Sequence, residues 1–157
     1  MSPDVGGVVR ARAMASKLHA DMAIVDKRRP APNVAKVMNI IGDVEGKHCI
    51  LIDDMVDTAG TLCAAVEALL ENGATKVSAY ATHGVLSGPA AQRLAESDIH
   101  ELVVTDSIRQ PQAVLDRGKV RIIGIGTLMG EALKRIYDDR PITNPYEQGI
   151  YTFSFRH

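Results

Sequence analysis

The stretch Cys49-Ile-Leu-Ile-Asp-Asp-Met-Val-Asp-Thr-Ala-Gly-Thr61 decides the fold, because an apolar run passes there into a polar loop. Cys49 to Ile52 is entirely apolar and has the length of a buried strand. Leu62 to Glu71 is rich in alanine and is followed by Asn72 and Gly73, which predicts a helix that ends there. We therefore expect a strand, a loop and a helix in direct succession.

The rest of the chain repeats this alternation of short apolar strands and helices of moderate length. Such a pattern is typical of a parallel sheet with helices on both faces and right-handed crossovers, so the fold class is α/β. The expected strands, besides Cys49 to Ile52, are Ala20 to Val25, Lys76 to Ala81, Glu101 to Thr105 and Val120 to Gly124. The further expected helices are Val8 to Leu18, Pro89 to Ser97 and Thr127 to Tyr137, the last with Met129, Leu133 and Ile136 at helical spacing as core packing.

Three segments fall outside this alternation. Asp26 to Asp43 contains three consecutive cations and two prolines, which resist regular structure, so it is expected to be a long mobile loop or an exposed excursion. Met1 to Gly7 starts directly with loop residues, which suggests a fragment whose preceding strand is missing. Asp138 to His157 is expected to be a C-terminal arm on a single domain that spans residues 1–157.

Composition argues against several classes of partner. The formal net charge is -1, so no global basic field attracts nucleic acid or a membrane surface. No apolar run approaches the roughly 18 residues of a membrane span, and no targeting segment is recognisable. Cys49 and Cys63 lie in apolar surroundings without metal-ligand spacing, as reduced cysteines of a cytoplasmic protein do. The expected protein is soluble and cytoplasmic, and it binds neither nucleic acid nor membrane.

The loop Asp53 to Thr61 is the strongest candidate for a binding site. In an open α/β sheet, ligands bind beyond the carboxyl ends of the strands, where this loop emerges. Its last part, Asp57-Thr58-Ala59-Gly60-Thr61, leads into a helix whose N-terminal amides and dipole favour an anion. Gly60 lets the backbone come close, and two threonine hydroxyls add donors. A phosphate monoester fits these groups.

Asp53 and Asp54 place two adjacent carboxylates at the strand end, where they repel each other unless a cation or hydroxyl groups engage them. A furanose offers a vicinal diol, so carboxylates beside a phosphate site predict recognition of ribose 5-phosphate. The alternative is purely structural: the two aspartates cap the strand and Thr58 caps the helix.

This loop resembles the phosphoribosyl-diphosphate loop shared by type I phosphoribosyltransferases and ribose-phosphate diphosphokinases. Further segments make the chain similar to the C-terminal half of a bacterial ribose-phosphate diphosphokinase, from Ser2 to about Tyr137. The resemblance implies a three-layer, parallel-sheet fold of the type I phosphoribosyltransferase kind. The segments that carry it, besides the loop, are Ser2 to Ala11, Asp26 to Asn33, Val37 to Asp43 and Ala81 to Pro89.

The implied reaction is Mg²⁺-dependent transfer of the β,γ-diphosphoryl group of ATP to the anomeric hydroxyl of ribose 5-phosphate. The products are 5-phosphoribosyl 1-diphosphate, used in nucleotide biosynthesis, and AMP. By the same resemblance, Asp4 binds the metal, and Lys27 and Arg29 belong to a mobile catalytic loop. Positioned cations of this kind neutralise charge in the transition state of such transfers.

The resemblance also implies that an N-terminal half, which holds most of the ATP site, is absent. The isolated chain should then bind sugar phosphate without turning it over, and a homo-oligomer is expected. Two alternatives stay open. A phosphoribosyltransferase would use the same loop but needs a hood for the base, and no segment offers one. A non-catalytic regulatory paralogue would not need its site residues.

Overall fold

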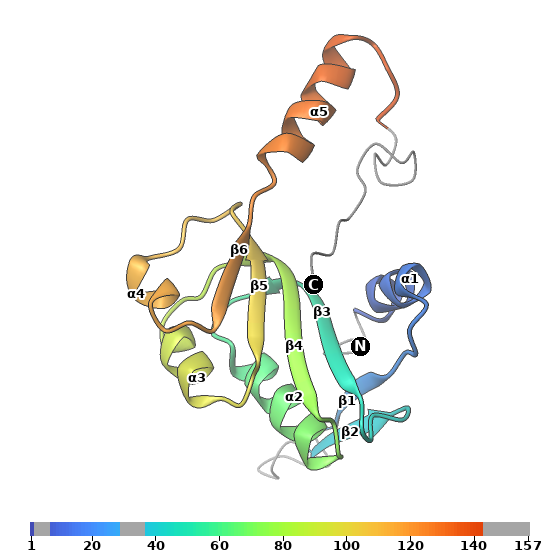
Figure 1. The fold of residues 1–157 in the computed structure, drawn as a ribbon, viewed down its shortest axis with the longest axis vertical. Coiled ribbons are helices and arrows are strands. Elements are labelled where there is room, and N and C mark those ends of the chain that lie inside the picture. Colours follow the sequence, from blue (N-terminus) through green and yellow to red (C-terminus); the bar gives the residue numbers. More distant parts are fainter. Residues whose placement is uncertain (2–6, 29–36, 143–157) are drawn as a thin grey trace. The chain divides into compact units, whose positions relative to one another are not determined.

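The computed structural model describes residue 1 and residues 7–28 and 37–142, which are coloured in Figure 1. The chain divides into two compact units, residues 1–123 and residues 124–157. The first unit contains all the described strands and every described residue of the candidate site. The expected single domain with an arm from Asp138 stays a prediction, because residues 143–157 lie outside the described part.

The centre of the first unit is a four-stranded parallel sheet, which confirms the α/β class (Figure 1). Its strands lie side by side in chain order, so each connection crosses over to the adjacent strand. Right-handed crossovers that all progress in one direction place their helices on the same face of the sheet. The strands are β3 (His48–Val56), β4 (Lys76–Gly84), β5 (Glu101–Thr105) and β6 (Val120–Ile123).

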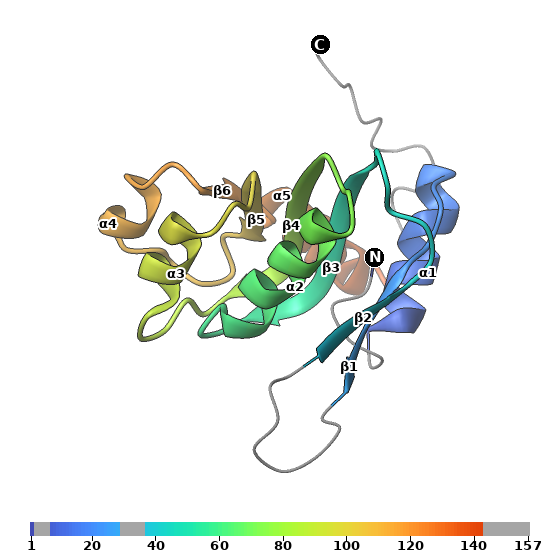
Figure 2. The same cartoon turned by 90° about the horizontal axis from the view of Figure 1, so that it is seen from below.

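The crossover helices are α2 (Gly60–Glu71), α3 (Ala90–Glu96) and the short α4 (Gln112–Leu115), which the sequence pattern did not reveal. Figure 2 shows α2 and α3 side by side on one side of the sheet. α2 ends at Asn72, whose side-chain amide donates to the Ala68 carbonyl at 2.8 Å. Gly73 follows with φ of 87°, the left-handed conformation that glycine adopts without a steric cost.

The core lies between α2 and the sheet. On the helix, Ala65, Val66 and Leu69 are at most 1% exposed, and on the strands Val77 and Leu102 are fully buried. The Ala-rich sequence of α2 explains this close packing, because small side chains let a helix approach a sheet. The free Cys49 is also buried here, and Cys63 is half-buried.

The expected mobile loop from Asp26 to Asp43 is wrong at both of its ends. β1 (Ile24–Arg28) and β2 (Val37–Ile41) pair as an antiparallel two-stranded sheet in which Asp26 faces Asn39. The segment Val37–Ile41 is rich in β-branched residues, which favours an extended strand even beside a charged partner. The cations and prolines that precede it favour a loop and so obscure this pattern in the sequence. The centre of the segment, residues 29–36, lies outside the described part.

The boundary of the central strand also differs from the prediction. β3 continues through Asp53, Asp54, Met55 and Val56, because its parallel pairing with β4 extends as far as Val56 opposite Gly84. α2 then begins at Gly60, two residues before the expected start. The true turn is therefore short, and both aspartates lie on a strand.

α1 (Val8–Leu18) matches the predicted helix and lies against β3. In the second unit, α5 (Gly126–Tyr137) also forms as expected, with an ion pair between Arg135 and Glu131 at 3.0 Å. The described residues of the second unit do not pack its apolar stripe as the expected core: Met129, Leu133 and Ile136 are 51%, 63% and 57% exposed.

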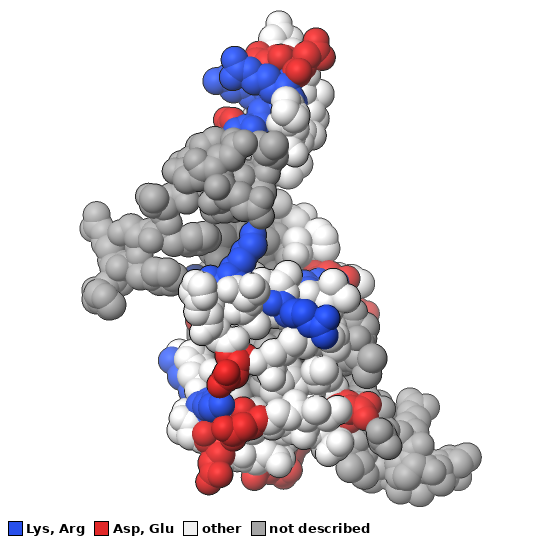
Figure 3. All heavy atoms as spheres, turned by 90° about the vertical axis from the view of Figure 1, so that its right-hand side faces the viewer, with Lys and Arg blue, Asp and Glu red and all other residues white. Residues whose placement is uncertain are grey.

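The charges in Figure 3 show Lys and Arg interspersed with Asp and Glu on the face that is visible there. This mixture of signs agrees with the formal net charge of -1 of the whole chain. Within residues 1, 7–28 and 37–142, the helices all lack the length and the apolar run that a membrane crossing requires.

A pair of matched substitutions tests the position of the core. Val66, in α2, is 1% exposed and Val9, in α1, is 77% exposed. Val66→Ala should lower the free energy of unfolding by about 1–3 kcal/mol, through lost burial and a residual cavity. Val9→Ala should change it by less than about 0.5 kcal/mol. Urea denaturation of both variants measures the difference, and equal losses would contradict the assigned core.

Candidate functional site

The candidate site lies at the carboxyl end of the sheet, where β3 and β4 finish together. Val56, the last residue of β3, is in register with Gly84, the last residue of β4. Its carbonyl accepts hydrogen bonds from the amides of Val85 and Leu86 at 2.9 and 3.1 Å. The chain that follows β4 is thereby held directly beside the turn that follows β3. This is the edge where parallel α/β sheets bind ligands.

We call residues 57–61 the phosphate loop. Asp57, Thr58 and Thr61 are exposed, while Ala59 is only 4% exposed and belongs to the hydrophobic core. Ala59 has φ of 58° and ψ of 2°, a left-handed conformation that residues with a Cβ rarely adopt. The loop is therefore anchored at its centre by a buried methyl group and exposes polar groups on either side.

The N-terminus of α2 follows this anchor. Ala59 is the residue before the helix, and no side chain in the described part of the chain caps it. The structural alternative that Thr58 caps α2 is therefore wrong. Because the first amides of a helix have no partner within the helix, this end favours an anion with acceptor oxygens. The hydroxyls of Thr58 and Thr61 lie in the same loop.

Two residues that follow β4 in the chain, Ser87 and Arg93, form hydrogen bonds with the phosphate loop. The Ser87 amide donates to the Asp57 carbonyl at 3.1 Å, and the Ser87 hydroxyl donates to Asp57 Oδ1 at 2.5 Å. Arg93, in α3, donates from Nη1 to the Thr58 carbonyl at 3.0 Å. These contacts connect the loop to the next strand-helix unit.

The mutual repulsion of Asp53 and Asp54 is offset by a cation, Arg10. The guanidinium of Arg10, in α1, contacts both carboxylates: Nη1 lies 3.1 Å from Asp53 Oδ1, and Nη2 lies 2.9 Å from Asp54 Oδ2. Asp53 Oδ1 also accepts from the Asp54 amide at 2.9 Å. The three side chains are partly exposed, at 40%, 30% and 64% for Arg10, Asp53 and Asp54. Ligand hydroxyls can therefore reach the carboxylates.

This arrangement changes the acidity of Asp54. Hydrogen bonding with the Asp53 side chain lowers the pKa of Asp54, and the charge of Arg10 lowers it further. Because the pKa is lower in the folded state, the stability that it contributes is present above the ordinary Asp range. That stability is lost as the pH falls through the lowered pKa. At neutral pH the site therefore presents an ionised acceptor.

The carboxyl ends of β4 and β5 add a small polar network beside the phosphate loop. His83 Nδ1 lies 2.9 Å from the Ser107 hydroxyl. Thr105 donates from its hydroxyl to the Thr82 carbonyl at 2.6 Å. His83 is exposed at this edge, so it is hydrogen-bonded without being buried.

Three of the predicted catalytic and metal-binding residues cannot be placed in the site. Asp4 and Arg29 lie outside the described residues. Lys27 is on β1, where its backbone is in register with Met38, and its side chain is not described. Around the residues whose side chains are described, no three His, Cys, Asp or Glu side chains are grouped as metal ligands.

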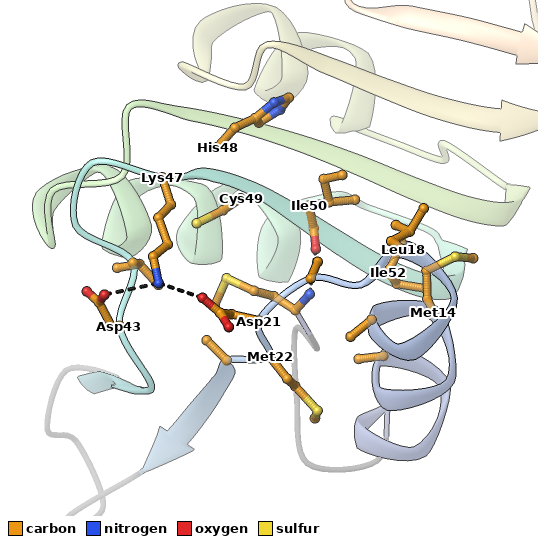
Figure 4. A pocket seen from close by; sticks show the side chains of 16 residues that line it. Met14, Leu18, Asp21, Met22, Asp43, Lys47, His48, Cys49, Ile50 and Ile52 are labelled. Carbon is orange, nitrogen blue, oxygen red and sulfur yellow. Dashed lines mark hydrogen bonds and ion pairs between the residues drawn. The ribbon is translucent and has the colours of Figure 1, made fainter. Parts of the chain in front are cut away.

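A pocket of about 340 Å³ lies away from this edge, between α1 and the amino-terminal part of β3 (Figure 4). Apolar residues such as Met14, Leu18 and Ile52 line much of it, and Lys47 bridges Asp21 and Asp43 at its polar end. Met1 lies against the outer edge of β3, where its amine donates to the Ile50 carbonyl at 2.6 Å. The candidate site instead presents exposed polar and charged side chains, which suit a charged ligand.

The sequence predicted the two aspartates and the phosphate loop but missed the residues that support them, Arg10, Ser87 and Arg93. The repulsion between Asp53 and Asp54 did signal that a cation was needed. It could not identify Arg10, which lies 43 residues earlier than Asp53.

Comparisons with known proteins all find similarity to one family of enzymes. The family model of the phosphoribosyl synthetase-associated domain matches residues 9–146. A ribose-phosphate pyrophosphokinase of Mesorhizobium japonicum is 56% identical over 147 residues, which cover 94% of this chain and 47% of that protein. One from Neisseria meningitidis is 49% identical over 154 residues, or 98% of this chain and 47% of the relative.

A solved structure supports the same grouping. The crystal structure of phosphoribosylpyrophosphate synthetase from Mycobacterium smegmatis aligns with a TM-score of 0.75 and 37% identity. The alignment covers 88% of this chain and 44% of that one. The chain thus spans about half the length of the curated relatives that it matches.

The role of Arg10 can be tested by carboxylate titration. Arg10→Ala should raise the pKa of Asp54, because it removes the positive charge that stabilises the ionised form. Arg12→Ala, an exposed arginine in the same helix, is the matched control and should leave the titration unchanged. Carboxyl ¹³C shifts recorded against pH measure both variants. An unchanged Asp54 titration in Arg10→Ala would refute the contact.

Proposed function

Because the chain belongs to the family of the phosphoribosyl synthetase-associated domain, we propose that it is a catalytic part of a ribose-phosphate diphosphokinase. The proposed reaction transfers the β,γ-diphosphoryl group of ATP to the anomeric hydroxyl of ribose 5-phosphate. The products are 5-phosphoribosyl 1-diphosphate and AMP. Within it, this chain supplies the sugar-phosphate site and part of the catalytic machinery.

One observation carries the proposal most directly: a helix N-terminus without a side-chain cap and two adjacent carboxylates lie a few residues apart at the same edge of the sheet. The helix end, with Thr58 and Thr61, suits a phosphate monoester. The carboxylates of Asp53 and Asp54 accept hydrogen bonds from vicinal hydroxyls. Ribose 5-phosphate carries both groups on one small molecule.

Arg10 prepares the carboxylates for this role. Two adjacent carboxylates would otherwise favour protonation of one of them. The guanidinium contacts both carboxylates and helps to lower the pKa of Asp54, and each carboxylate can accept a ligand hydroxyl on its exposed side. The proposed site is therefore organised before the sugar binds, which reduces the cost of ordering it on binding.

The transfer step in this proposal depends on Lys27, Arg29 and Asp4, whose roles follow from the resemblance of the sequence. Lys27 and Arg29 supply positive charge to the transferring diphosphoryl group, since such transfers gain most of their catalysis from positioning and charge neutralisation. Mg²⁺ would supply further neutralisation. Asp4 would hold it with ATP oxygens and water, because Mg²⁺ commonly binds through one or two carboxylates and substrate phosphates.

The remaining parts of the proposal concern the whole enzyme. The relatives are about twice as long, so we propose that the chain corresponds to a C-terminal half and that the other half holds most of the ATP site. The chain alone would bind ribose 5-phosphate but not complete the reaction. We further propose a cytoplasmic homo-oligomer.

Binding of ribose 5-phosphate is the first test. Thr61→Ala should weaken it about 10- to 100-fold, as expected for the loss of one charge-assisted hydrogen bond of about 1.5–3 kcal/mol. Asp53→Asn should weaken ribose 5-phosphate but leave inorganic phosphate nearly unchanged. Thr75→Ala, an exposed threonine before the opposite end of β4, is the matched control. Calorimetry that detects no heat with any pentose phosphate would refute the site.

The reaction itself separates the proposal from a phosphoribosyltransferase, which shares this type of loop. With ATP, Mg²⁺, ribose 5-phosphate and a complementing N-terminal half, we expect release of AMP. Arg29→Ala should slow that release by at least about tenfold without abolishing sugar binding. Pyrophosphate released from 5-phosphoribosyl 1-diphosphate in the presence of a base would instead support the transferase. Absence of both activities would favour a non-catalytic paralogue.

A further inference from the structure

The phosphate loop contains a conformation that needs support. Ala59 adopts a left-handed backbone with φ of 58°, although its Cβ makes this unfavourable. Such residues persist only where the surrounding structure over-determines them. The buried Ala59 methyl group supplies part of this support from the core side. The Ala59 carbonyl accepts from the Cys63 amide at 2.9 Å, which fixes the peptide group after Ala59. The peptide group before Ala59 needs a contact of its own.

Arg93 contacts the peptide group on the N-terminal side of Ala59. Its Nη1 donates to the Thr58 carbonyl at 3.0 Å, so it binds the peptide group that joins Thr58 to Ala59. In a planar trans peptide the carbonyl and the following N–H point in opposite directions. A Thr58 carbonyl held towards α3 therefore turns the Ala59 N–H away from α3. Arg93 thus sets the orientation of a loop amide without using that amide.

Gly60 lies against the same guanidinium. A Cβ built on Gly60 would come within 3.1 Å of Arg93 Nη1 and 3.7 Å of Arg93 Cζ, whereas Thr58 Oγ1 would be 3.9 Å away. Gly60 does not have a positive φ, so its backbone does not require glycine. The space that it leaves is occupied by Arg93. The sequence predicted that Gly60 lets the backbone come close to a ligand, and the structure adds this contact with Arg93.

We propose that Arg93 is a positioning residue of the phosphate loop, which it holds through the Thr58 carbonyl in the space left by Gly60. The proposal rests on the proposed function, in which this loop binds the 5-phosphate. Ser87 supports the preceding residue through two hydrogen bonds to Asp57. Together they make the anion site depend on α3 and on the segment before it, as well as on β3 and α2.

The first test compares Arg93 variants by calorimetry with ribose 5-phosphate and with inorganic phosphate as probes. Arg93→Ala should weaken both ligands at least about tenfold, because the loop amides lose their fixed orientation. Arg93→Lys, which keeps a donor and the charge, should recover part of the affinity. Arg117→Ala, an exposed arginine before the opposite end of β6, should bind like the parent chain. Equal affinity of Arg93→Ala and the parent would overturn the proposal.

The second test separates positioning from direct contact with the ligand. The ¹³Cα shift of Ala59 in the ligand-free protein reports its left-handed conformation, and Arg93→Ala should move it. An unmoved Ala59 signal together with lost affinity would mean that Arg93 contacts the phosphate itself, which contradicts the proposal. A melting curve for each variant verifies folding, and Arg93→Lys carries both tests if Arg93→Ala does not fold.

A double-mutant cycle tests the part played by Gly60. Gly60→Ala should weaken phosphate binding in the parent chain but add little in the Arg93→Ala background, because the displaced group is already gone. Equal losses in both backgrounds would show that Gly60 serves the ligand directly and would refute the coupling. If the parent chain binds neither probe, the proposed function fails. If it binds both and the variants do not differ from it, only the role of Arg93 fails.

Discussion

The parallel register between β3 and β4 is the constraint on which the rest of the site depends. It brings Val56 opposite Gly84, so the two connections leave the sheet at the same height. One connection becomes the phosphate loop, and the other provides Ser87 and leads to Arg93. A shift of one residue in this register would move every side chain on β3 to the other face of the sheet. Leu51 and Asp53, which share one face of β3, would then exchange faces with Asp54.

Charge is arranged in this molecule by local pairing. With a net charge of -1, the chain has no overall field to attract a phosphorylated ligand. The site instead combines a helix N-terminus, the positive Arg93 behind it, and an acidic pair held by Arg10. The proposed anion site and the proposed diol site lie next to each other, and the charged groups of each have their own partners. Such a site is less sensitive to distant charges, because salt screens those over about 8–10 Å.

The sequence predicted the elements that follow from local pattern. Apolar runs identified β3 to β6, and the Ala-rich segment identified α2, because these patterns need no knowledge of distant residues. Two predictions of a loop were wrong because they relied on local composition where pairing with another strand decides the structure. The cations and prolines after Asp26 concealed the pairing of β1 with β2, and the acidic residues after Ile52 were assigned to a loop although pairing with β4 keeps them on a strand.

The candidate site shows the same limit. Asp53, Asp54 and the phosphate loop could be predicted as a candidate site because these residues are adjacent in the sequence. Arg10 and Arg93 could not, since their contacts join residues 43 and 35 positions apart. The apolar stripe of α5 shows a different limit, because helical spacing reveals an apolar face but not whether anything covers it.

The chain order of the four strands also bears on how the site forms. Because neighbours in the sheet are neighbours in the sequence, the contacts of the phosphate loop close short distances along the chain: 30 residues from Asp57 to Ser87 and 35 from Thr58 to Arg93. The entropy lost in closing a loop rises only with the logarithm of its length, and topologies with local contacts fold faster. All the elements of the proposed anion site thus lie within a contiguous segment of fewer than 50 residues, from β3 to α3. A mutation outside that segment, such as one at Arg10, can change the neighbouring acidic pair while the contacts of the phosphate loop stay intact.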